Sequence, residues 1–278
     1  MIHDILFPLV GGKSDAAALS HAVALASDTG SHLSVLQVID LPVPYIGPMG
    51  VSPDYLLAEL YGELRRTAAQ EASELRARLD REGISWELRT TETILGDAPG
   101  ILSLHGRHAD LGIVPACRPD EGGKALVFFH ALLFESGRPV LVMPPSLSGA
   151  FPPRHAAIAW RPTREATRSL HDALPLLARC STVDVVCVDP QARPDRDGEE
   201  PGTDIAVHLA RHGLQVNVVT LSSGGAEVAT VLVRHCRESG AGLLVAGGYG
   251  HARAREWILG GTTRSLLEEA ALPILFSH

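Results

Sequence analysis

The stretch AGLLVAGGYGHARAREWILGGTTRSLL, residues 241–267, places glycines on both sides of a charged and bulky segment. It opens with the apolar run LLVA, which predicts a strand ending near Gly247, and closes with TRSLL, which has helical spacing of apolar residues. Gly247, Gly248 and Gly250 allow a positive φ and let backbone N–H groups approach a ligand closely. The first N–H groups of the following helix lack internal partners and favour an anion such as phosphate. The stretch therefore predicts a strand, an anion-binding loop and a helix N-terminus.

Strands and helices alternate along the whole chain, and the order occurs twice. In the first half we expect strands at residues 3–10, 32–40, 84–94, 109–116 and 138–145, and helices at 16–30, from 53 onwards and at 98–108. In the second half we expect strands at 156–160, 182–190, 214–222, 241–248 and 272–278, and helices at 164–178, 205–212, 227–239 and 262–271. The segment SGRPVLVMP matches AALPILFSH, and RHADLGIVPA matches ESGAGLLVAG. We infer an internal duplication.

Length and composition agree with two layered α/β domains. The chain has 278 residues, of which 45% are hydrophobic but only 5% aromatic, so small aliphatic residues must fill the cores. Alternating strands and helices predict parallel sheets covered by helices on both faces. Ligands of such sheets bind outside the carboxyl ends of the strands, where the strand order reverses.

Charge and cysteine usage exclude several classes of partner. The formal net charge of −8 gives no general attraction to nucleic acid. The four cysteines, Cys117, Cys180, Cys187 and Cys236, form no CxxC pair, and the start MIHDILFPLV resembles no signal peptide. No apolar run approaches the roughly 20 residues that span a bilayer. We expect a cytoplasmic protein that binds neither nucleic acid nor membrane.

The spacing of Gly247, Gly250 and Gly260 resembles the nucleotide-binding signature of the universal stress protein family, and the duplicated order of elements resembles a tandem member. The segment REATRSLHDALPLL is also similar to the first helix of the family. The resemblance implies two Rossmann-like or flavodoxin-like domains of the adenine nucleotide alpha hydrolase type, each with a five-stranded parallel sheet, at residues 1–147 and 154–278. It also implies binding of ATP, ADP or AMP, with or without magnesium, and a role in stress response.

Site residues carry over from the family by position. Ala246, Gly247 and Gly250 would line the ribose and the phosphates. The following helix would hold the phosphates through Gly260, Gly261, Thr262 and Thr263. The second strand of the half ends in Val188 and Asp189, which would border the adenine, and Trp160 ends the first strand beside them. His251, next to the glycine loop, would either contact phosphate or lie exposed.

The sequence departs from the family pattern at two places in the second half. Arg161 and Pro162 stand where the family has an aspartate followed by a glycine, so Arg161 either pairs with a phosphate or blocks the pocket. Gly261 replaces a common serine, which removes a hydroxyl but keeps a backbone donor.

The first half has lost more of the pattern. It reads VPACRPDEGGKALVFFHALLF at the corresponding place, without the glycine spacing. We therefore expect no nucleotide there, and instead an internal pseudo-dimer in which the first half packs against the second. A homodimer of whole chains stays open.

Other sites receive less support from the sequence. GGKS at residues 11–14 is not a P-loop, because Phe7 stands where the first glycine is required. His105 and His108 lie one helical turn apart without further ligands, so we predict no metal site. No nucleophile faces His171 and Asp172, so no catalytic residue is predicted, and slow ATP hydrolysis without a dedicated base stays open.

Three hypotheses remain. In the first, the second half binds an adenine nucleotide. In the second, both halves are degenerate and the fold serves as a nucleotide-independent scaffold for interaction or dimerisation, which Arg161 favours. In the third, an enzyme acts on another adenylated or phosphorylated small molecule at the same cleft, for which the sequence offers no acid–base pair.

Overall fold

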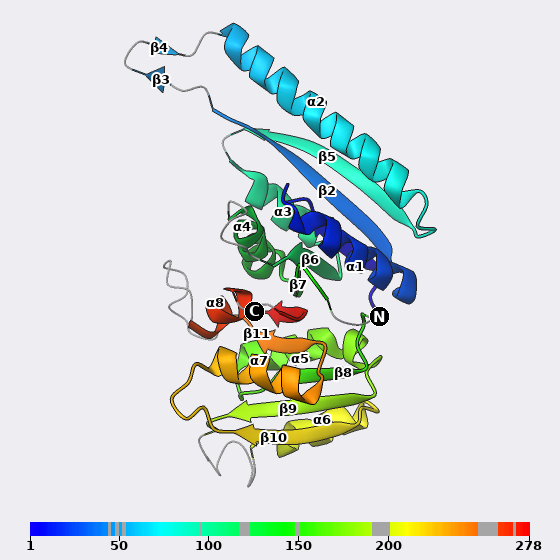
Figure 1. The fold of residues 1–278 in the computed structure, drawn as a ribbon, viewed down its shortest axis with the longest axis vertical. Helices are drawn as coiled ribbons and strands as arrows, with labels where there is room; N and C mark the ends of the chain where they lie inside the picture. The colour runs from blue at the N-terminus through cyan, green and yellow to red at the C-terminus, as the bar shows by residue number, and fades with distance from the viewer. Residues whose placement is uncertain are drawn as a thin grey trace.

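The protein forms one ten-stranded sheet covered by helices on both faces (Figure 1). The computed structural model describes residues 1–43, 46–47, 50–51, 54–94, 96–116, 123–147, 151–190, 201–249, 261–268 and 271–278. The strands lie in the order β10-β9-β8-β11-β12-β7-β6-β1-β2-β5. Five consecutive sheet positions belong to each half of the chain, as the repeat in the sequence predicts.

Each half contributes a parallel sheet of five strands. The first half supplies β1 (Asp4–Pro8), β2 (His32–Leu41), β5 (Trp86–Ile94), β6 (Leu111–Pro115) and β7 (Val140–Met143). The second supplies β8 (His155–Ala159), β9 (Thr182–Val188), β10 (Val216–Leu221), β11 (Leu244–Gly247) and β12 (Ile274–Ser277). Counted within its own half, each sheet has the order 3-2-1-4-5 of a Rossmann-type unit. The strand order reverses between β1 and β6 in one half and between β8 and β11 in the other.

The two sheets join through an antiparallel pair of their last strands. Ile274, Leu275 and Phe276 of β12 lie opposite Val142, Leu141 and Val140 of β7. All six residues are fully buried, each with a relative exposure of 0%. The pair therefore removes one open edge of each sheet and continues their apolar surfaces across the junction.

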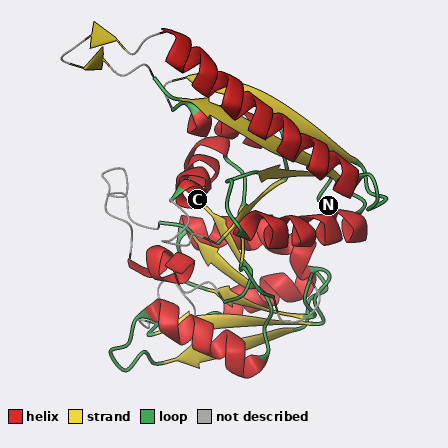
Figure 2. Cartoon of the chain, turned by 45° about the horizontal axis from the view of Figure 1, so that its top comes forward, coloured by secondary structure: helices red, strands yellow, loops and turns green. Residues whose placement is uncertain are grey.

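Helices complete a core on each face of the sheet (Figure 2). One core contains residues of α1 (Ser14–Thr29), α2 (Asp54–Leu79), α5 (Arg164–Leu177) and α6 (Thr203–Arg211). The other contains residues of α3 (Ala98–Gly106), α4 (Lys124–Ala131), α7 (Val228–Ser239) and α8 (Gly261–Glu268). A short π-helix, Leu132–Ser136, continues α4. Each core draws residues from both halves, so the halves share their hydrophobic interior.

The first half differs from the second by a long projection. Only residues 32–36 of β2 pair with β1. The pairing of β2 with β5 extends further, from Leu33–Trp86 to Leu41–Ile94. The 26-residue helix α2 packs along this ribbon, which extends away from the rest of the sheet in Figure 1. The sequence predicts a plain loop at residues 41–53, but a two-stranded antiparallel pair, β3 (Ile46–Gly47) and β4 (Gly50–Val51), lies there. Two-residue strands are too short to show an alternating pattern.

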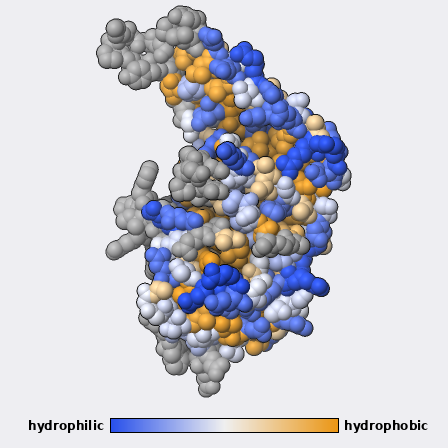
Figure 3. Space-filling model, viewed as in Figure 1, coloured by the Kyte–Doolittle hydropathy of each residue, from blue (hydrophilic) through white to orange (hydrophobic). Residues whose placement is uncertain are grey.

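The surface is mixed in polarity. On the face drawn in Figure 3, hydrophobic residues occur in several separate patches between hydrophilic ones. Within the described part of the chain, no helix is both long enough and apolar enough to cross a membrane.

A buried carboxylate links three elements of the second half at the amino-terminal side of its sheet. Asp184 of β9 is only 4% exposed. It accepts hydrogen bonds from Asn217 Nδ2 at 3.0 Å and from His235 Nε2 at 2.9 Å. His155 Nε2 lies 3.1 Å from the carboxylate, within ion-pair range but outside hydrogen-bond geometry. Burial opposes ionisation of Asp184, but these partners outweigh it and hold its pKa below the ordinary value.

Replacing this carboxylate should destabilise the fold. We expect Asp184→Ala to lower the free energy of unfolding by about 2–4 kcal/mol, because it leaves buried donors without an acceptor. Asp28→Ala removes an exposed ion pair with Arg179 and should cost no more than about 1 kcal/mol. Urea denaturation at pH 7 measures both. Because the folded pKa of Asp184 is depressed, its contribution is present above the unfolded pKa and is lost as the pH falls through the folded one. Equal losses in the two variants would contradict this role.

Candidate functional site

A cavity of about 520 Å³ opens at the carboxyl ends of β8 and β9. Its lining comes from residues 160–163 after β8, residues 187–190 at the end of β9, residues 201–205 at the start of α6, and Val228. The size is within the range of small-molecule sites. The cavity lies beside the place where the strand order reverses, which is where ligands of open α/β sheets bind.

Strand pairing fixes the side chains that enter the cavity. Ile158 and Ala159 of β8 lie opposite Val185 and Val186 of β9. The backbone N–H of Trp160 continues this ladder by donating to Val186 O at 2.9 Å. The two chains then separate at Trp160 and Val188, and the space between them is the mouth of the cavity.

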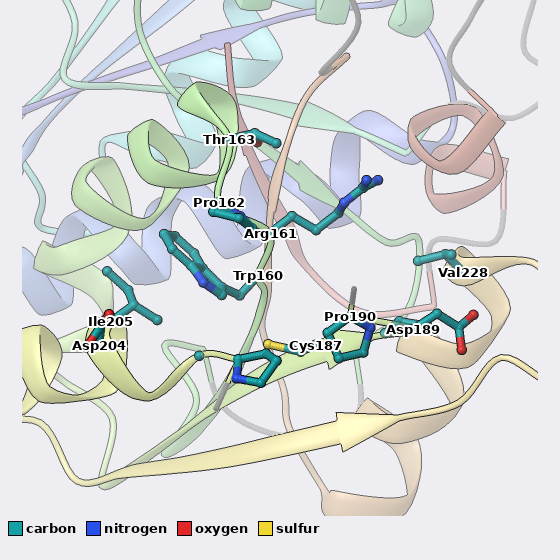
Figure 4. Close-up of a pocket in the computed structure, with 13 residues that line it drawn as sticks. Trp160, Arg161, Pro162, Thr163, Cys187, Asp189, Pro190, Asp204, Ile205 and Val228 are labelled. Atoms are coloured by element: carbon teal, nitrogen blue, oxygen red, sulfur yellow. The ribbon is translucent and has the colours of Figure 1, made fainter. Parts of the chain in front are cut away.

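The walls combine apolar surface with a few polar groups. Figure 4 shows the Trp160 ring close to Ile205 at one side of the cavity, with Cys187 on its floor. Cys187 is buried, and Ile205 and Trp160 are half-buried. Asp189, Asp204 and Arg161 are exposed and supply the charged groups. Such a cavity suits a flat, largely apolar ring that carries polar substituents.

Asp189, which lines the cavity, joins the end of β9 to the end of β10. Its backbone has φ 44, a left-handed conformation that aspartate tolerates better than most residues. Its Oδ1 accepts the backbone N–H of Ser223 at 3.0 Å, and its own N–H donates to Leu221 O at 2.9 Å. Hydrogen bonds from Ser223 hold the pKa of Asp189 below its ordinary value. The carboxylate therefore joins the ends of β9 and β10.

Arg161 lies beside the glycine turn. Leu244 and Val245 of β11 lie opposite Ala157 and Ile158, so the chain that leaves β8 at Arg161 runs beside the end of β11. The side chain is exposed and makes no ion pair with any residue that the structure describes. In Figure 4 it extends away from Trp160 and Ile205. The guanidinium therefore lies outside the apolar part of the cavity.

The glycine stretch begins against the first helix of the half. Ala246 is buried, and a Cβ at Gly247 would lie 2.7 Å from the backbone nitrogen of Ala166. Gly261 and Thr262 are exposed in the first turn of α8, whereas Thr263 is buried and accepts the N–H of Tyr249 at 3.3 Å. Gly250, His251 and Gly260 lie outside the described residues. The structure thus brings Trp160, Arg161, Val188 and Asp189 to one cavity. Gly247 ends β11, the strand beside β8, and α8 follows β11 along the chain.

Several residues that line the cavity were not predicted from the sequence. Ile205, Asp204 and the Pro201–Gly202 turn reach the cavity from α6, which follows a long polar segment. Gly202 has φ 87, and a proline–glycine pair before a helix is a signal that could have placed this turn. In the described ranges, no three side chains are arranged to hold a metal ion.

Comparisons with known proteins identify the fold. No family model matches the sequence, and no curated protein matches it either. A universal stress protein from Archaeoglobus fulgidus has a similar structure, with TM-score 0.74 and 16% identity, covering 99% of this chain and 95% of that one. A putative universal stress protein from Pseudomonas aeruginosa matches with TM-score 0.62 and 17% identity, covering 99% and 93%. A functionally unknown protein from the same species matches with TM-score 0.58 and 16% identity, covering 99% and 92%. The predicted resemblance to universal stress proteins is confirmed at the level of the fold.

The close approach at Gly247 gives a testable prediction. Gly247→Ala would place its Cβ under 3.0 Å from the backbone of Glu165 and Ala166, so the end of β11 must move. We expect a loss of about 1–3 kcal/mol in the free energy of unfolding. At Gly261 an added Cβ would meet no atom of the described residues within 4 Å, so Gly261→Ala is the matched control and should be close to neutral. Thermal denaturation compares the two, and equal melting temperatures would contradict the packing.

Proposed function

We propose that this chain is a tandem universal stress protein whose second half binds an adenine nucleotide and which acts in stress response. The observation that carries the proposal is the cavity beside the reversal of strand order in the second half, lined by Trp160, Val188 and Asp189. The glycine spacing that follows β11 supports a phosphate site next to it. The adenine would lie against Trp160 and Ile205, and the phosphates would extend towards Gly247, Gly261 and Thr262.

The two halves would have different tasks in this proposal. Residues 154–278 would form the nucleotide-binding domain. Residues 1–147 would form a degenerate domain that binds no nucleotide and packs against the nucleotide-binding domain of the same chain. Pairing of β7 with β12 supports an internal pseudo-dimer. The cytoplasm is the proposed location. Binding rather than rapid turnover is the proposed activity.

A direct experiment tests the binding claim. Freshly purified protein is denatured, and the released small molecules are identified by mass spectrometry. The emptied protein is then refolded or apo-purified and titrated calorimetrically with ATP, with and without magnesium. We expect about one adenine nucleotide per chain, as a single binding half requires. Two nucleotides per chain would overturn the division between the halves, and no binding at millimolar ATP would overturn the proposal.

Substitutions at Arg161 test whether its side chain binds a phosphate or blocks the pocket. Because its guanidinium is exposed and unpaired among the described residues, we expect it to bind a phosphate. Arg161→Ala should weaken ATP binding about 5- to 10-fold, the loss of one charge-assisted hydrogen bond, and leave adenosine binding unchanged. Arg164→Ala removes the same charge from an exposed position outside the cavity and is the control. Tighter ATP binding by Arg161→Asp would show that the arginine blocks the pocket.

The alternative is a scaffold of the same fold that needs no nucleotide. Arg161, in place of the family aspartate, is the feature that favours it. In that case the glycines would only allow the turn after β11 and the start of α8. An empty protein that ignores ATP and whose oligomeric state does not respond to it would support this alternative.

A further inference from the structure

Tyr249 lies in a strained backbone conformation at the start of the glycine loop. It follows Gly248 directly after β11 and has φ 55. In the described part of the chain, Tyr249 and Asp189 are the two non-glycine residues with positive φ, and both follow strands that end at the cavity side of the sheet. For a bulky aromatic residue this conformation is unfavourable, so surrounding contacts must hold it.

Those contacts come from the other half of the chain. The Tyr249 hydroxyl lies 2.9 Å from Nε2 of His130, which is the penultimate residue of α4. The Tyr249 ring also packs on Phe134, with ring centroids 5.0 Å apart. Tyr249 is only 5% exposed, and its contact with His130 is partly buried. Burial lowers the pKa of His130, which keeps its ring neutral and able to share one proton with the hydroxyl.

The neighbours of Tyr249 are fixed against the same surface. The N–H of Gly248 donates to Ser277 O at 2.8 Å, and His278 Nδ1 lies 3.0 Å from Gly248 O. A Cβ at Gly248 would lie 2.9 Å from Leu133 Cδ2, so Gly248 packs closely against the first half, and a larger residue would require the end of this leucine side chain to shift. The His278 ring in turn contacts Phe134 edge-on at 5.0 Å. The π-helix of the first half therefore forms the support on which the loop begins.

Tyr249 also reaches the far end of the loop. Its N–H donates to Thr263 Oγ1 at 3.3 Å, and Thr263 is 4% exposed in the first turn of α8. One residue thus connects the end of β11, the start of α8 and the first half of the chain. A shift of Tyr249 would change the relative position of the two segments that, under the proposed function, hold the phosphates.

We propose that His130 of the first half is a positioning residue for the nucleotide site of the second half and acts through Tyr249. This inference rests on the proposed function. The first half, which we expect to bind no nucleotide, keeps Tyr249 in its strained conformation and so holds the end of β11 and the first turn of α8 in place for phosphate. Preorganisation of this kind increases affinity because the ordering cost is met before the ligand arrives.

Calorimetric titration with ATP tests the coupling. We expect His130→Ala and Tyr249→Phe each to raise the Kd for ATP about 5- to 10-fold, the range of one hydrogen bond that acts through coupling. His130→Gln keeps a donor and an acceptor and should stay within about 2-fold of the wild type. The double variant His130→Ala/Tyr249→Phe should lose little more than either single variant, because both remove the same contact.

His105→Ala is the matched control. His105 is also a half-buried histidine of the first half with a pKa lowered by burial, but its partner is Arg89 of the same half. It should leave the Kd for ATP unchanged within about 2-fold, since no contact with the loop is lost. An equal loss of affinity in His105→Ala and His130→Ala would reduce the effect to general destabilisation and overturn the proposal.

Hydrogen exchange without nucleotide separates this inference from the proposed function. The amides of Gly248 and Tyr249 should exchange faster in His130→Ala and Tyr249→Phe than in the wild type, while those of β9 stay unchanged. If the wild type binds no ATP, the proposed function fails, and the exchange rates alone decide whether His130 holds the loop. If the wild type binds ATP but His130→Ala changes neither Kd nor exchange, the function stands and the positioning role is wrong.

Discussion

The antiparallel pair of β7 with β12 is the interaction on which the rest of the structure depends. Three residue pairs join two parallel sheets that would otherwise each expose an apolar edge strand. Because the pair continues both cores, neither half has a complete hydrophobic interior without the other. The same pair places the end of β12 against the π-helix of the first half, which brings Phe134 to His278 and His130 to Tyr249.

Duplication has left the two halves with different uses for the same strand order. The second half has a cavity of about 520 Å³ at the ends of β8 and β9, with an exposed arginine beside the glycine turn. The first half has extended β2 and β5 and the long helix α2. Its helix α4 and π-helix support the loop of the second half. In this account the first half contributes to the site through contact rather than through ligand binding.

Local patterns in the sequence were sufficient to predict the strands, the helices and their repeated order, since periodicity and turn residues indicate which segments form each element. The resemblance to universal stress proteins, rather than a local pattern, pointed to Trp160, Val188 and Asp189, which lie at the carboxyl ends of two neighbouring parallel strands. The contact of Tyr249 with His130 spans 119 residues and depends on how the two sheets join, which no local pattern encodes. The place of Ile205 in the cavity lining was not predicted for a similar reason, because no local pattern in the sequence shows where α6 lies relative to the strands.

A crystal structure of the full chain grown with ATP would test the central claim most directly. The account predicts one nucleotide per chain, with its base against Trp160 and Ile205 and its phosphates near Arg161 and the first turn of α8. It also predicts Tyr249 in the same left-handed conformation and in contact with His130. A nucleotide bound in the first half, or a second half empty at saturating ATP, would contradict it.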